Sequence, residues 1–435
     1  MTQTKIPNGA DGPAQSHRFA IIFIFITVLL NMIGLGVIMP VMPQLIQSVT
    51  HGDLADAAQW GGLLTFSYAA VQFLMMPIIG GLSDRYGRRP VLLCSLAAYT
   101  LDFFVMAIAP TITMILIARL LAGAFAATFS TANAYIADIT PPEKRAANFG
   151  LMGAAFGLGF IIGPGIGGVL GDFYGPRAPF YFVASLGAAN FIFGYFFLPE
   201  TLAPESRRPF EWKRANAFGN FIQLKKFPAL IPIAGAVFLY QLAHWAFPSV
   251  WSYFAEERFA WSPSQIGVSL MLVGFSAALV QGGLTRIIIP KIGERNAVLF
   301  GTTIAFVSYF GFAFVGSGAA VYGLIAFSAL AGVTQPALQG IMSRKIPKDA
   351  QGELQGAIAA IASLSMVLSP PVMTQIFAAF SAPEKPIVVF GLLLSQTGTG
   401  VYFPGAPFFC AGLIVVFAFV PIAIAFRQLT ASETI

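Results

Sequence analysis

The sequence predicts an all-α, polytopic membrane protein whose 12 transmembrane helices form two pseudo-symmetric six-helix bundles. Three observations predict this fold class: an apolar composition, twelve apolar segments of membrane-spanning length, and a repeat about half a chain apart. Of the 435 residues, 57% are apolar and only 10% are charged, whereas about 25% are charged in ordinary soluble proteins. A soluble domain of this length could not bury so much apolar surface, so lipid is expected to cover it.

A membrane-spanning helix needs about 20 predominantly apolar residues. Twelve segments meet this requirement, at 19–42, 60–82, 91–109, 112–137, 146–170, 179–198, 229–254, 263–285, 296–315, 319–342, 353–380 and 405–426. The apolar part of segment 381–404 is too short to span, so we expect an extracytoplasmic loop there. The predicted organisation is an N-tail at 1–18, a bundle at 19–198, a linker at 199–228, a second bundle at 229–426 and a C-tail at 427–435.

Basic residues gather in alternate loops of this arrangement. Of the 24 Lys and Arg residues, 20 lie on one side of the membrane if both termini lie on that side. Cytoplasmic loops carry an excess of Lys and Arg, so both termini are predicted to be cytoplasmic. This topology accounts for the net charge of +6, and no nucleic-acid partner is expected.

Cysteine and catalytic patterns argue against an enzyme. Cys94 and Cys410 both lie in apolar segments, which indicates neither a disulfide framework nor a metal site. The predicted spans contain no HExxH pair, no Ser/His cluster and no paired aspartates. No enzymatic activity, no metal and no resident cofactor are therefore expected.

The repeat connects the two predicted bundles. Gly80-Gly81-Leu82-Ser83 closes the second span, and Gly282-Gly283-Leu284-Thr285 closes the eighth span 202 residues later. The long basic linker lies between them. Transporters built from such repeats bind substrate at the repeat interface near the middle of the bilayer.

The second span ends in Gly80-Gly81-Leu82-Ser83-Asp84-Arg85-Tyr86-Gly87-Arg88-Arg89-Pro90. This segment resembles the G-x-L-S-D-R-x-G-R-R motif of the major facilitator superfamily, a family of membrane transporters. The resemblance implies a gate at the cytoplasmic mouth, formed by Gly81, Asp84, Arg85, Gly87, Arg88 and Arg89. It also implies that Asp84 faces the start of the eleventh span, near residue 352, when that mouth is closed, because a carboxylate is stable beside a helix N-terminus. In the alternative interpretation, the arginines only keep the loop in the cytoplasm.

The second copy of this motif is degraded. Arg286 stands where the repeat would place Asp84, and about four residues are inserted before Gly293-Glu294-Arg295. We therefore expect an asymmetric gate network.

The fifth span is rich in glycine, at Gly153, Gly157, Gly163, Pro164 and Gly167. This pattern resembles the glycine-proline motif of the drug–proton antiporter branch of the superfamily. The alternative is close helix packing of the kind found in any membrane protein.

Asp102 and Arg119 lie deep in the third and fourth spans, at matching depth on a helical hairpin, roughly 12 Å from its turn at 1.5 Å per residue. An ionisable residue inside a membrane span is expensive and indicates a function. Asp102 is therefore the expected proton-linked carboxylate, with Arg119 as its partner. A static structural pair is the alternative.

Further segments resemble the tetracycline-efflux (TetA) group. They are Leu30-Asn31-Met32-Ile33-Gly34-Leu35-Gly36-Val37-Ile38-Met39-Pro40, Leu101-Asp102-Phe103, Ala137-Asp138-Ile139-Thr140 and Pro404-Gly405-Ala406-Pro407-Phe408. That group exchanges a tetracycline–divalent-metal complex for a proton. The resemblance implies a bacterial inner-membrane protein, acting as a monomer, with the metal bound to the substrate. The first motif departs from the group at Asn31, where the group has an aspartate, and Asn cannot titrate.

Other polar residues in the spans are candidates for substrate binding. With Asn31 and Asp102, they are Gln72, Gln241, His244 and Gln335. His244 is the only histidine in a predicted span, and histidine titrates near physiological pH. The alternative for each is a hydrogen bond between helices.

These observations favour a secondary active transporter that exports small amphipathic compounds, such as tetracycline-like drugs, in exchange for protons by alternating access. Its partners would be the substrate, protons and the lipid bilayer. A proton-coupled symporter importing a sugar or an organic acid is the alternative within transport. A non-transporting membrane sensor is the alternative of another class, although no loop is long enough for an output domain.

Overall fold

The computed structural model describes residues 13–212, 215–219, 227–347, 350–389 and 392–433. Most of the predicted N-tail, part of the predicted linker, the basic residues Lys5, Lys213, Arg214, Lys225, Lys226 and Lys348, and the end of the C-tail lie outside the described residues. Within the described residues, 12 helical segments are long and apolar enough to cross a membrane. The predicted fold class and number of spans are confirmed.

Eight spans are continuous helices. They are α1 (Pro13–Thr50), α2 (Leu54–Tyr86), α3 (Arg88–Ile108), α6 (Pro142–Tyr174), α7 (Ala178–Phe197), α13 (Glu294–Phe314), α16 (Gln351–Ser381) and α17 (Ala406–Glu433). Several continue beyond the predicted bounds, because hydropathy marks the part of a helix that suits the hydrocarbon region and not the point where its hydrogen bonding stops.

Four spans are interrupted. The fourth consists of α4 (Ile112–Ala124) and α5 (Thr128–Ile139), and the seventh consists of α9 (Ile231–His244) and α10 (Ala246–Phe259). The eighth contains α11 (Pro263–Leu279), a π-helical turn η3 (Val280–Leu284) and α12 (Thr285–Ile292). The tenth contains α14 (Gly318–Ser328), a 3-10 segment η4 (Ala329–Val333) and α15 (Thr334–Arg344). Hydropathy did not predict these interruptions.

The remaining elements are short. The 3-10 turn η1 (Pro204–Ser206) lies in the predicted linker, and the 3-10 turn η2 (Pro228–Leu230) begins at the last residue of that linker. Between α16 and α17, strands β1 (Ile387–Val389) and β2 (Leu392–Ser395) form an antiparallel hairpin in which Val389 pairs with Leu392. This segment does not span, as predicted, but it contains strands that the loop prediction did not include.

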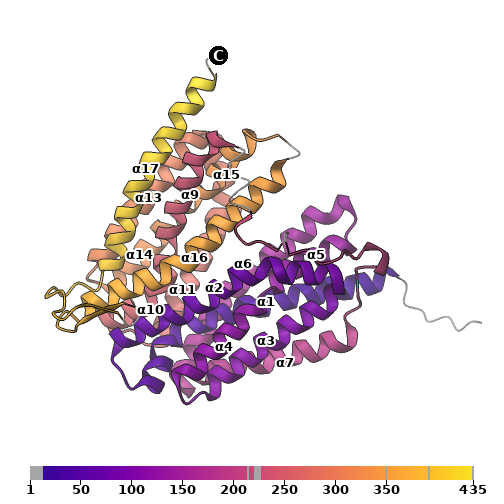
Figure 1. Cartoon of the computed structure of the whole chain (residues 1–435). Coiled ribbons are helices and arrows are strands. Elements are labelled where there is room, and N and C mark those ends of the chain that lie inside the picture. The colour runs from indigo at the N-terminus through magenta and orange to yellow at the C-terminus, as the bar shows by residue number, and fades with distance from the viewer. Residues whose placement is uncertain (1–12, 213–214, 220–226, 348–349, 390–391, 434–435) are drawn as a thin grey trace, which may run out of the picture.

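The helices of the two halves form two groups. In Figure 1 the first half, indigo to magenta, fills the lower part of the picture, and the second half extends to the upper left. Across the boundary, α6 packs on α11 and α2 packs on α16. We call the end of the molecule that carries the β hairpin the hairpin end, and the opposite end, which carries Arg85, Arg88, Arg89 and Arg344, the arginine end.

Polar contacts join the two halves at the hairpin end. The Lys385 ammonium lies 2.7 Å from the Asp53 carboxylate and 3.0 Å from that of Asp56. The Ser252 hydroxyl donates to the Met39 carbonyl oxygen at 2.7 Å. The two halves are therefore closed against each other at this end.

Toward the arginine end the halves diverge. A Cβ atom built on Gly62, in the hairpin-end half of α2, would meet the side chain of Thr374 on α16. A Cβ atom built on Gly80, near the other end of α2, or on Gly352, at the start of α16, would meet no described atom within 4 Å. At these two positions, unlike at Gly62, the described residues make no close contact between α2 and α16.

The second half has an aromatic core near the hairpin end. Trp251 is fully buried, its ring stacks on Phe247 with centroids 4.4 Å apart, and its indole N–H donates to the Ser269 hydroxyl at 2.8 Å. Phe312 and Phe408 pack against the same ring. Because lipid removes most of the hydrophobic driving force between helices, such close packing is what holds them together.

Candidate functional site

A buried ion pair joins the third and fourth spans. Asp102 on α3 is 3% exposed, and Arg119 on α4 is 8% exposed. The Arg119 Nε donates to Asp102 Oδ1 at 3.0 Å, and a terminal guanidinium nitrogen contacts Oδ2, so the contact is bidentate. The structure thus brings together the two residues that the sequence analysis paired.

The helical hairpin explains this pairing. Helix α3 ends at Ile108, and α4 begins after Thr111, whose hydroxyl caps the new helix by accepting the Met114 N–H. A short turn makes the two helices antiparallel neighbours, so residues equally distant from the turn lie at the same depth. The bidentate geometry suits a planar guanidinium and a carboxylate.

Aromatic rings complete the surroundings of Arg119. The guanidinium carbon lies 5.2 Å from the centroid of the Tyr68 ring and 6.0 Å from that of Phe103. Tyr99 packs on Phe103 at 4.7 Å and donates its hydroxyl hydrogen to the Leu30 carbonyl oxygen at 2.7 Å. Helices α1 to α4 therefore enclose the pair, and the ring faces offer the cation electrostatic compensation that lipid does not.

Asn31 lies on α1, next to the residue whose carbonyl accepts Tyr99. Its side-chain Nδ2 is buried and has no hydrogen-bond partner within the described part of the chain. A buried donor left unpaired costs about 1–3 kcal/mol. An acceptor brought by another molecule would remove that cost.

Gln72 on α2 has a different environment. Its amide Nε2 donates to the Ala126 carbonyl oxygen at 3.3 Å, in the interruption between α4 and α5. The hydrogen bond joins α2 to the fourth span, and a role of Gln72 in substrate binding stays a prediction.

The candidates in the second half lie apart from the ion pair. Gln241 and Gln335 are half-buried on α9 and α15, and His244 is exposed at the last residue of α9. Among the described residues, no hydrogen bond or ion pair links these three side chains to Asp102 or Arg119. The six predicted substrate-binding residues therefore do not form one cluster in this conformation.

The predicted gate motif forms a network around Arg88. The Arg88 guanidinium lies 2.6 Å from the Asp84 carboxylate and 3.1 Å from that of Asp138. It also donates to the Ser83 hydroxyl at 3.1 Å. One side chain thus connects the end of α2 with the end of α5.

The other motif residues lie close by. Gly87 has φ +109°, which favours glycine, and it separates α2 from α3. Arg89 donates to the Tyr195 carbonyl oxygen at 2.6 Å, and the Arg85 guanidinium lies 5.1 Å from the Tyr86 ring centroid. A Cβ atom on Gly81 would approach the Phe210 ring.

Sequence analysis missed two members of this network, Asp138 and Glu200. The Glu200 carboxylate accepts the backbone N–H groups of Arg88 at 2.9 Å and Arg89 at 3.2 Å, which caps the start of α3. Both acidic residues come one or two positions after a predicted span that ends on the same side as Arg88. Their position in the sequence could therefore have identified them as possible partners of the basic residues at that end.

The second half carries a related pair. Glu294 begins α13, Arg344 ends α15, and the guanidinium contacts both carboxylate oxygens. Glu294 comes 206 residues after Arg88, and Arg344 comes 206 residues after Asp138. The second half therefore has an acidic residue where the first half has a basic one, and a basic residue where the first half has an acidic one.

The glycine-proline motif of α6 divides into two parts. Cβ atoms on Gly163 and Gly167 would collide with the backbone of α1, at Ile33 and Val37. Cβ atoms on Gly153 and Gly157, nearer the arginine end, would meet no described atom within 4 Å. Pro164 packs beside Gly36. Only the part near the hairpin end therefore acts as a packing surface in this conformation.

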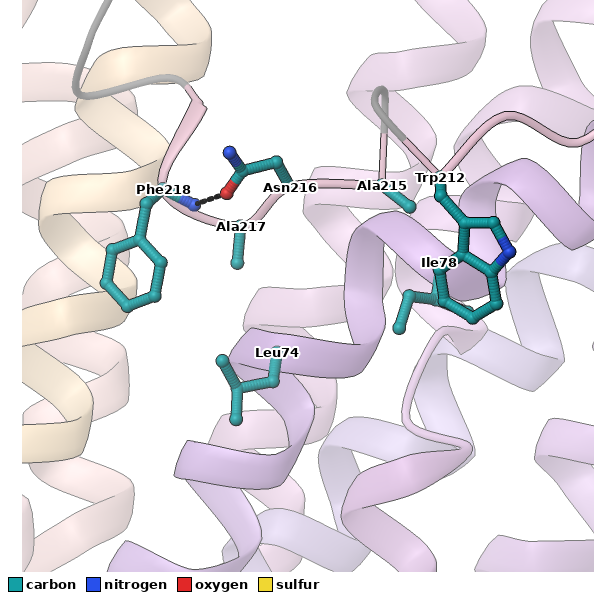
Figure 2. A pocket seen from close by; sticks show the side chains of 7 residues that line it. All are labelled: Leu74, Ile78, Trp212, Ala215, Asn216, Ala217 and Phe218. Atoms are coloured by element: carbon teal, nitrogen blue, oxygen red, sulfur yellow. Dashed lines mark hydrogen bonds between the residues drawn. The ribbon is translucent and has the colours of Figure 1, made fainter.

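A cavity of about 570 Å³ lies between α2 and the linker. Figure 2 shows its lining residues, which are Leu74, Ile78, Trp212, Ala215, Asn216, Ala217 and Phe218. The Phe218 ring also packs edge-on against Phe73 at 5.3 Å. None of the predicted substrate-binding residues lines this cavity.

No group of three or more His, Cys, Asp or Glu side chains that could hold a metal ion occurs in the described ranges. Cys94 and Cys410 are free thiols on different spans. The absence of a resident metal stays a prediction.

Comparison with known proteins gives consistent matches. The profile described as Major Facilitator Superfamily matches residues 24–370. The class C tetracycline resistance protein of Escherichia coli is 39% identical over 360 residues, which cover 83% of this chain and 90% of that protein. The class B protein of Escherichia coli is 35% identical, covering 80% and 86%.

Solved structures share the fold. An inward-facing bacterial homologue of the human lysosomal transporter Spinster has a TM-score of 0.75 and 16% identity, covering 96% of this chain and 98% of that one. The human organic anion transporter MFSD10 has a TM-score of 0.65 and 22% identity, covering 95% and 100%. At these identities the likeness concerns the fold alone.

Proposed function

The chain belongs to the major facilitator superfamily, and from that membership we propose that it exports tetracycline-like amphipathic compounds in exchange for protons. It is a multi-pass membrane protein and a secondary transporter, and it is not an enzyme. The observation that carries the proposal is the buried Asp102–Arg119 pair, because a charge pair deep in a span points to ion coupling.

Asp102 acts as the proton-binding carboxylate in this proposal. Protonation removes its negative charge, so the bidentate contact with Arg119 weakens, and the carboxyl group gains one O–H donor while its other oxygen remains an acceptor. Arg119 keeps its contacts with the rings of Tyr68 and Phe103. If the two conformations bind the proton with different affinity, its arrival shifts the population between them.

The substrate site lies between the halves. In this proposal Asn31 and Asp102 contribute to the site from the first half, and Gln241, His244 and Gln335 contribute from the second. Gln72 is held by its hydrogen bond to the Ala126 carbonyl oxygen. The unpaired Nδ2 of Asn31 supports a role as donor to a substrate oxygen. A divalent metal, if required, travels as part of the substrate.

The arginine end is cytoplasmic in this proposal, as the distribution of basic residues supports. Both termini then lie in the cytoplasm of a bacterial cell, and the protein works in the inner membrane as a monomer. The lack of any described atom within 4 Å of a Cβ at Gly80 or at Gly352, in contrast to Gly62, supports a cytoplasm-open conformation. Asp84, Arg85 and Arg88 form the latch that closes on the start of α16.

Drug-driven proton movement tests the function directly. In everted vesicles or proteoliposomes, tetracycline with Mg²⁺ is expected to change the internal pH with the wild type and not with Asp102→Asn. Tetracycline without Mg²⁺ and a panel of cationic dyes define the substrate class. If no compound moves protons, the antiporter proposal is wrong, and proton-coupled uptake of sugars or organic acids is the function to assay next.

A further inference from the structure

The end of α6 repeats the pattern of the gate motif at the opposite end of the molecule. Helix α2 ends in Gly80-Gly81-Leu82-Ser83-Asp84-Arg85-Tyr86-Gly87, and α6 ends in Gly167-Gly168-Val169-Leu170-Gly171-Asp172-Phe173-Tyr174-Gly175. In both, a glycine pair is followed by an aspartate, a tyrosine and a glycine. Asp84 and Asp172 each stand three residues before that last glycine.

The backbone geometry of the two ends also agrees. Gly87 has φ +109° and Gly175 has φ +84°. Each donates its N–H to the carbonyl four residues earlier, Ser83 at 3.1 Å and Gly171 at 3.0 Å. The two aspartates are therefore held in the same relation to a helix end, but α2 ends at the arginine end and α6 at the hairpin end.

Asp172 makes the kind of contact that the family resemblance implies for Asp84. Its Oδ2 accepts the Ser262 hydroxyl at 2.8 Å and the Ser264 backbone N–H at 3.1 Å. Ser262 is the N-cap of α11, so the carboxylate lies at the positive end of a helix in the other half. The glycines beside it permit this approach, because a Cβ atom on Gly168 would collide with the Pro263 backbone.

We propose that Asp172 is the hairpin-end counterpart of Asp84, a positioning carboxylate that holds the start of α11 and stabilises the conformation closed at that end. The inference rests on the proposed function in one respect, that the halves alternate between two conformations. Opening at the hairpin end separates α6 from α11 and breaks the contact, while closing at the arginine end forms the contact of Asp84 with α16. Asp172 therefore stabilises the conformation closed at the hairpin end, and Asp84 stabilises the conformation closed at the arginine end.

The test measures the distance between the halves at the hairpin end. Spin labels are placed at Pro110→Cys and Ser317→Cys, which are exposed and lie in turns of different halves, in a Cys94→Ser, Cys410→Ala background. Asp172→Asn removes the negative charge beside the N-terminus of α11, and it is expected to raise the ratio of hairpin-end-open to closed protein roughly two- to fivefold, the typical effect of one charge at a helix end. Asp84→Asn is expected to lower the same ratio, and the double variant to lie between the two.

Controls separate a latch from a local structural role. Glu384→Gln removes an exposed carboxylate at the same end and is expected to leave the ratio unchanged. Ser262→Ala removes one of the two donors and is expected to give part of the shift. Asp172→Glu keeps the charge and is expected to restore part of the closed population, even if Asp172→Asn lowers the yield of folded protein.

The result that overturns the inference is an unchanged distance distribution in Asp172→Asn, or a shift in the same direction as in Asp84→Asn. These measurements need no drug. Loss of drug-driven proton movement in the wild type would contradict the proposed function and leave this inference intact, because the distances report the conformational equilibrium alone.

Discussion

Arg344 contacts Glu294 across the ends of α15 and α13, where the repeat places Asp138 and Arg88 with the opposite charges. The first half therefore holds its acidic residue at the end of the fourth span and its basic residue at the start of the third. The second half has its basic residue at the end of the tenth span and its acidic residue at the start of the ninth. The two pairs differ in burial: the Arg344 side chain is 67% exposed, and that of Arg88 is 12% exposed.

This difference predicts unequal effects of mutation. Arg344→Ala is expected to lower the free energy of unfolding by about 1 kcal/mol or less, because exposed ion pairs contribute little. Asp138→Ala is expected to lower it by about 1–3 kcal/mol, because it removes one charged partner of a poorly solvated guanidinium. Denaturation in detergent, followed by tryptophan fluorescence, compares the two. Equal effects would contradict the burial argument.

The Asp102–Arg119 pair predicts a separation of stability from transport. Asp102→Asn leaves Arg119 buried without a counter-ion, which is expected to cost about 3–5 kcal/mol and to abolish proton movement. Asp102→Asn combined with Arg119→Met removes both charges, so most of the stability is expected to return, but proton movement is not. Thermal unfolding and vesicle pH measurements are made on the same preparations. Transport by the double variant would show that the pair is only structural.

Asn31 predicts a trade between stability and substrate binding. Asn31→Leu removes the unpaired buried amide, so the free energy of unfolding is expected to rise by up to about 1–3 kcal/mol. The same variant lacks the proposed donor to the substrate, so KM for transport is expected to rise roughly tenfold, the equivalent of about 1.4 kcal/mol. Asn31→Asp serves as the polar control. An unchanged KM for Asn31→Leu would remove Asn31 from the substrate site.

The glycines of α6 predict opposite consequences along one helix. Gly163→Ala and Gly167→Ala force a methyl group against the α1 backbone and are expected to destabilise the fold by about 1–3 kcal/mol. Gly157→Ala meets open space in this conformation and is expected to leave thermal stability unchanged while slowing transport, because closure at the arginine end brings α6 and its neighbours together. Unfolding temperature and transport rate are measured for each variant. Full activity in Gly157→Ala would contradict this account of closure.

Lys385 predicts how pH affects the hairpin end. Burial raises the pKa of the Asp53 carboxyl, but the hydrogen bond and charge of Lys385 and the hydrogen bonds with Asp56 together lower it more, so its pKa lies below the ordinary 3.8. Burial lowers the pKa of the Lys385 ammonium, and its contacts with Asp53 and Asp56 raise it more, above the ordinary 10.5. The contribution of Asp53 is therefore present above pH 3.8 and lost as the pH falls through its depressed pKa. That of Lys385 is present below pH 10.5 and lost as the pH rises through its raised pKa.

Between those limits the ion-pair cluster is expected to favour closure equally at every pH. The distance between labels at positions 110 and 317 is measured at pH 7 and at pH 3.5, with Lys385→Gln as the matched control. A larger open population at pH 3.5 is expected in the wild type, and a smaller pH effect in the control. The same acid response in both proteins would mean that Lys385 is not its source.

The sequence predicted the features that depend on local composition and spacing. Twelve spans follow from hydropathy, and the Asp102–Arg119 pair follows from equal distances to one turn. The contacts of Arg88 with Asp138 and Glu200 join residues 50 and 112 positions apart, so they depend on how whole helices pack. The interruptions at residues 125–127 and 329–333 could not be predicted, because the residues there are as apolar as their neighbours.

The interruption between α4 and α5 has a mechanical consequence. A continuous helix transmits any tilt along its whole length, but here the regular α-helical hydrogen bonding gives way to shorter-range bonds at Phe125, Ala126 and Ala127 before α5 begins at Thr128. We expect the part that carries Arg119 to stay beside Asp102 while the part that ends near Asp138 moves with Arg88. On the proposed function, an interruption at this place would let the arginine end move without pulling apart the charge pair in the membrane.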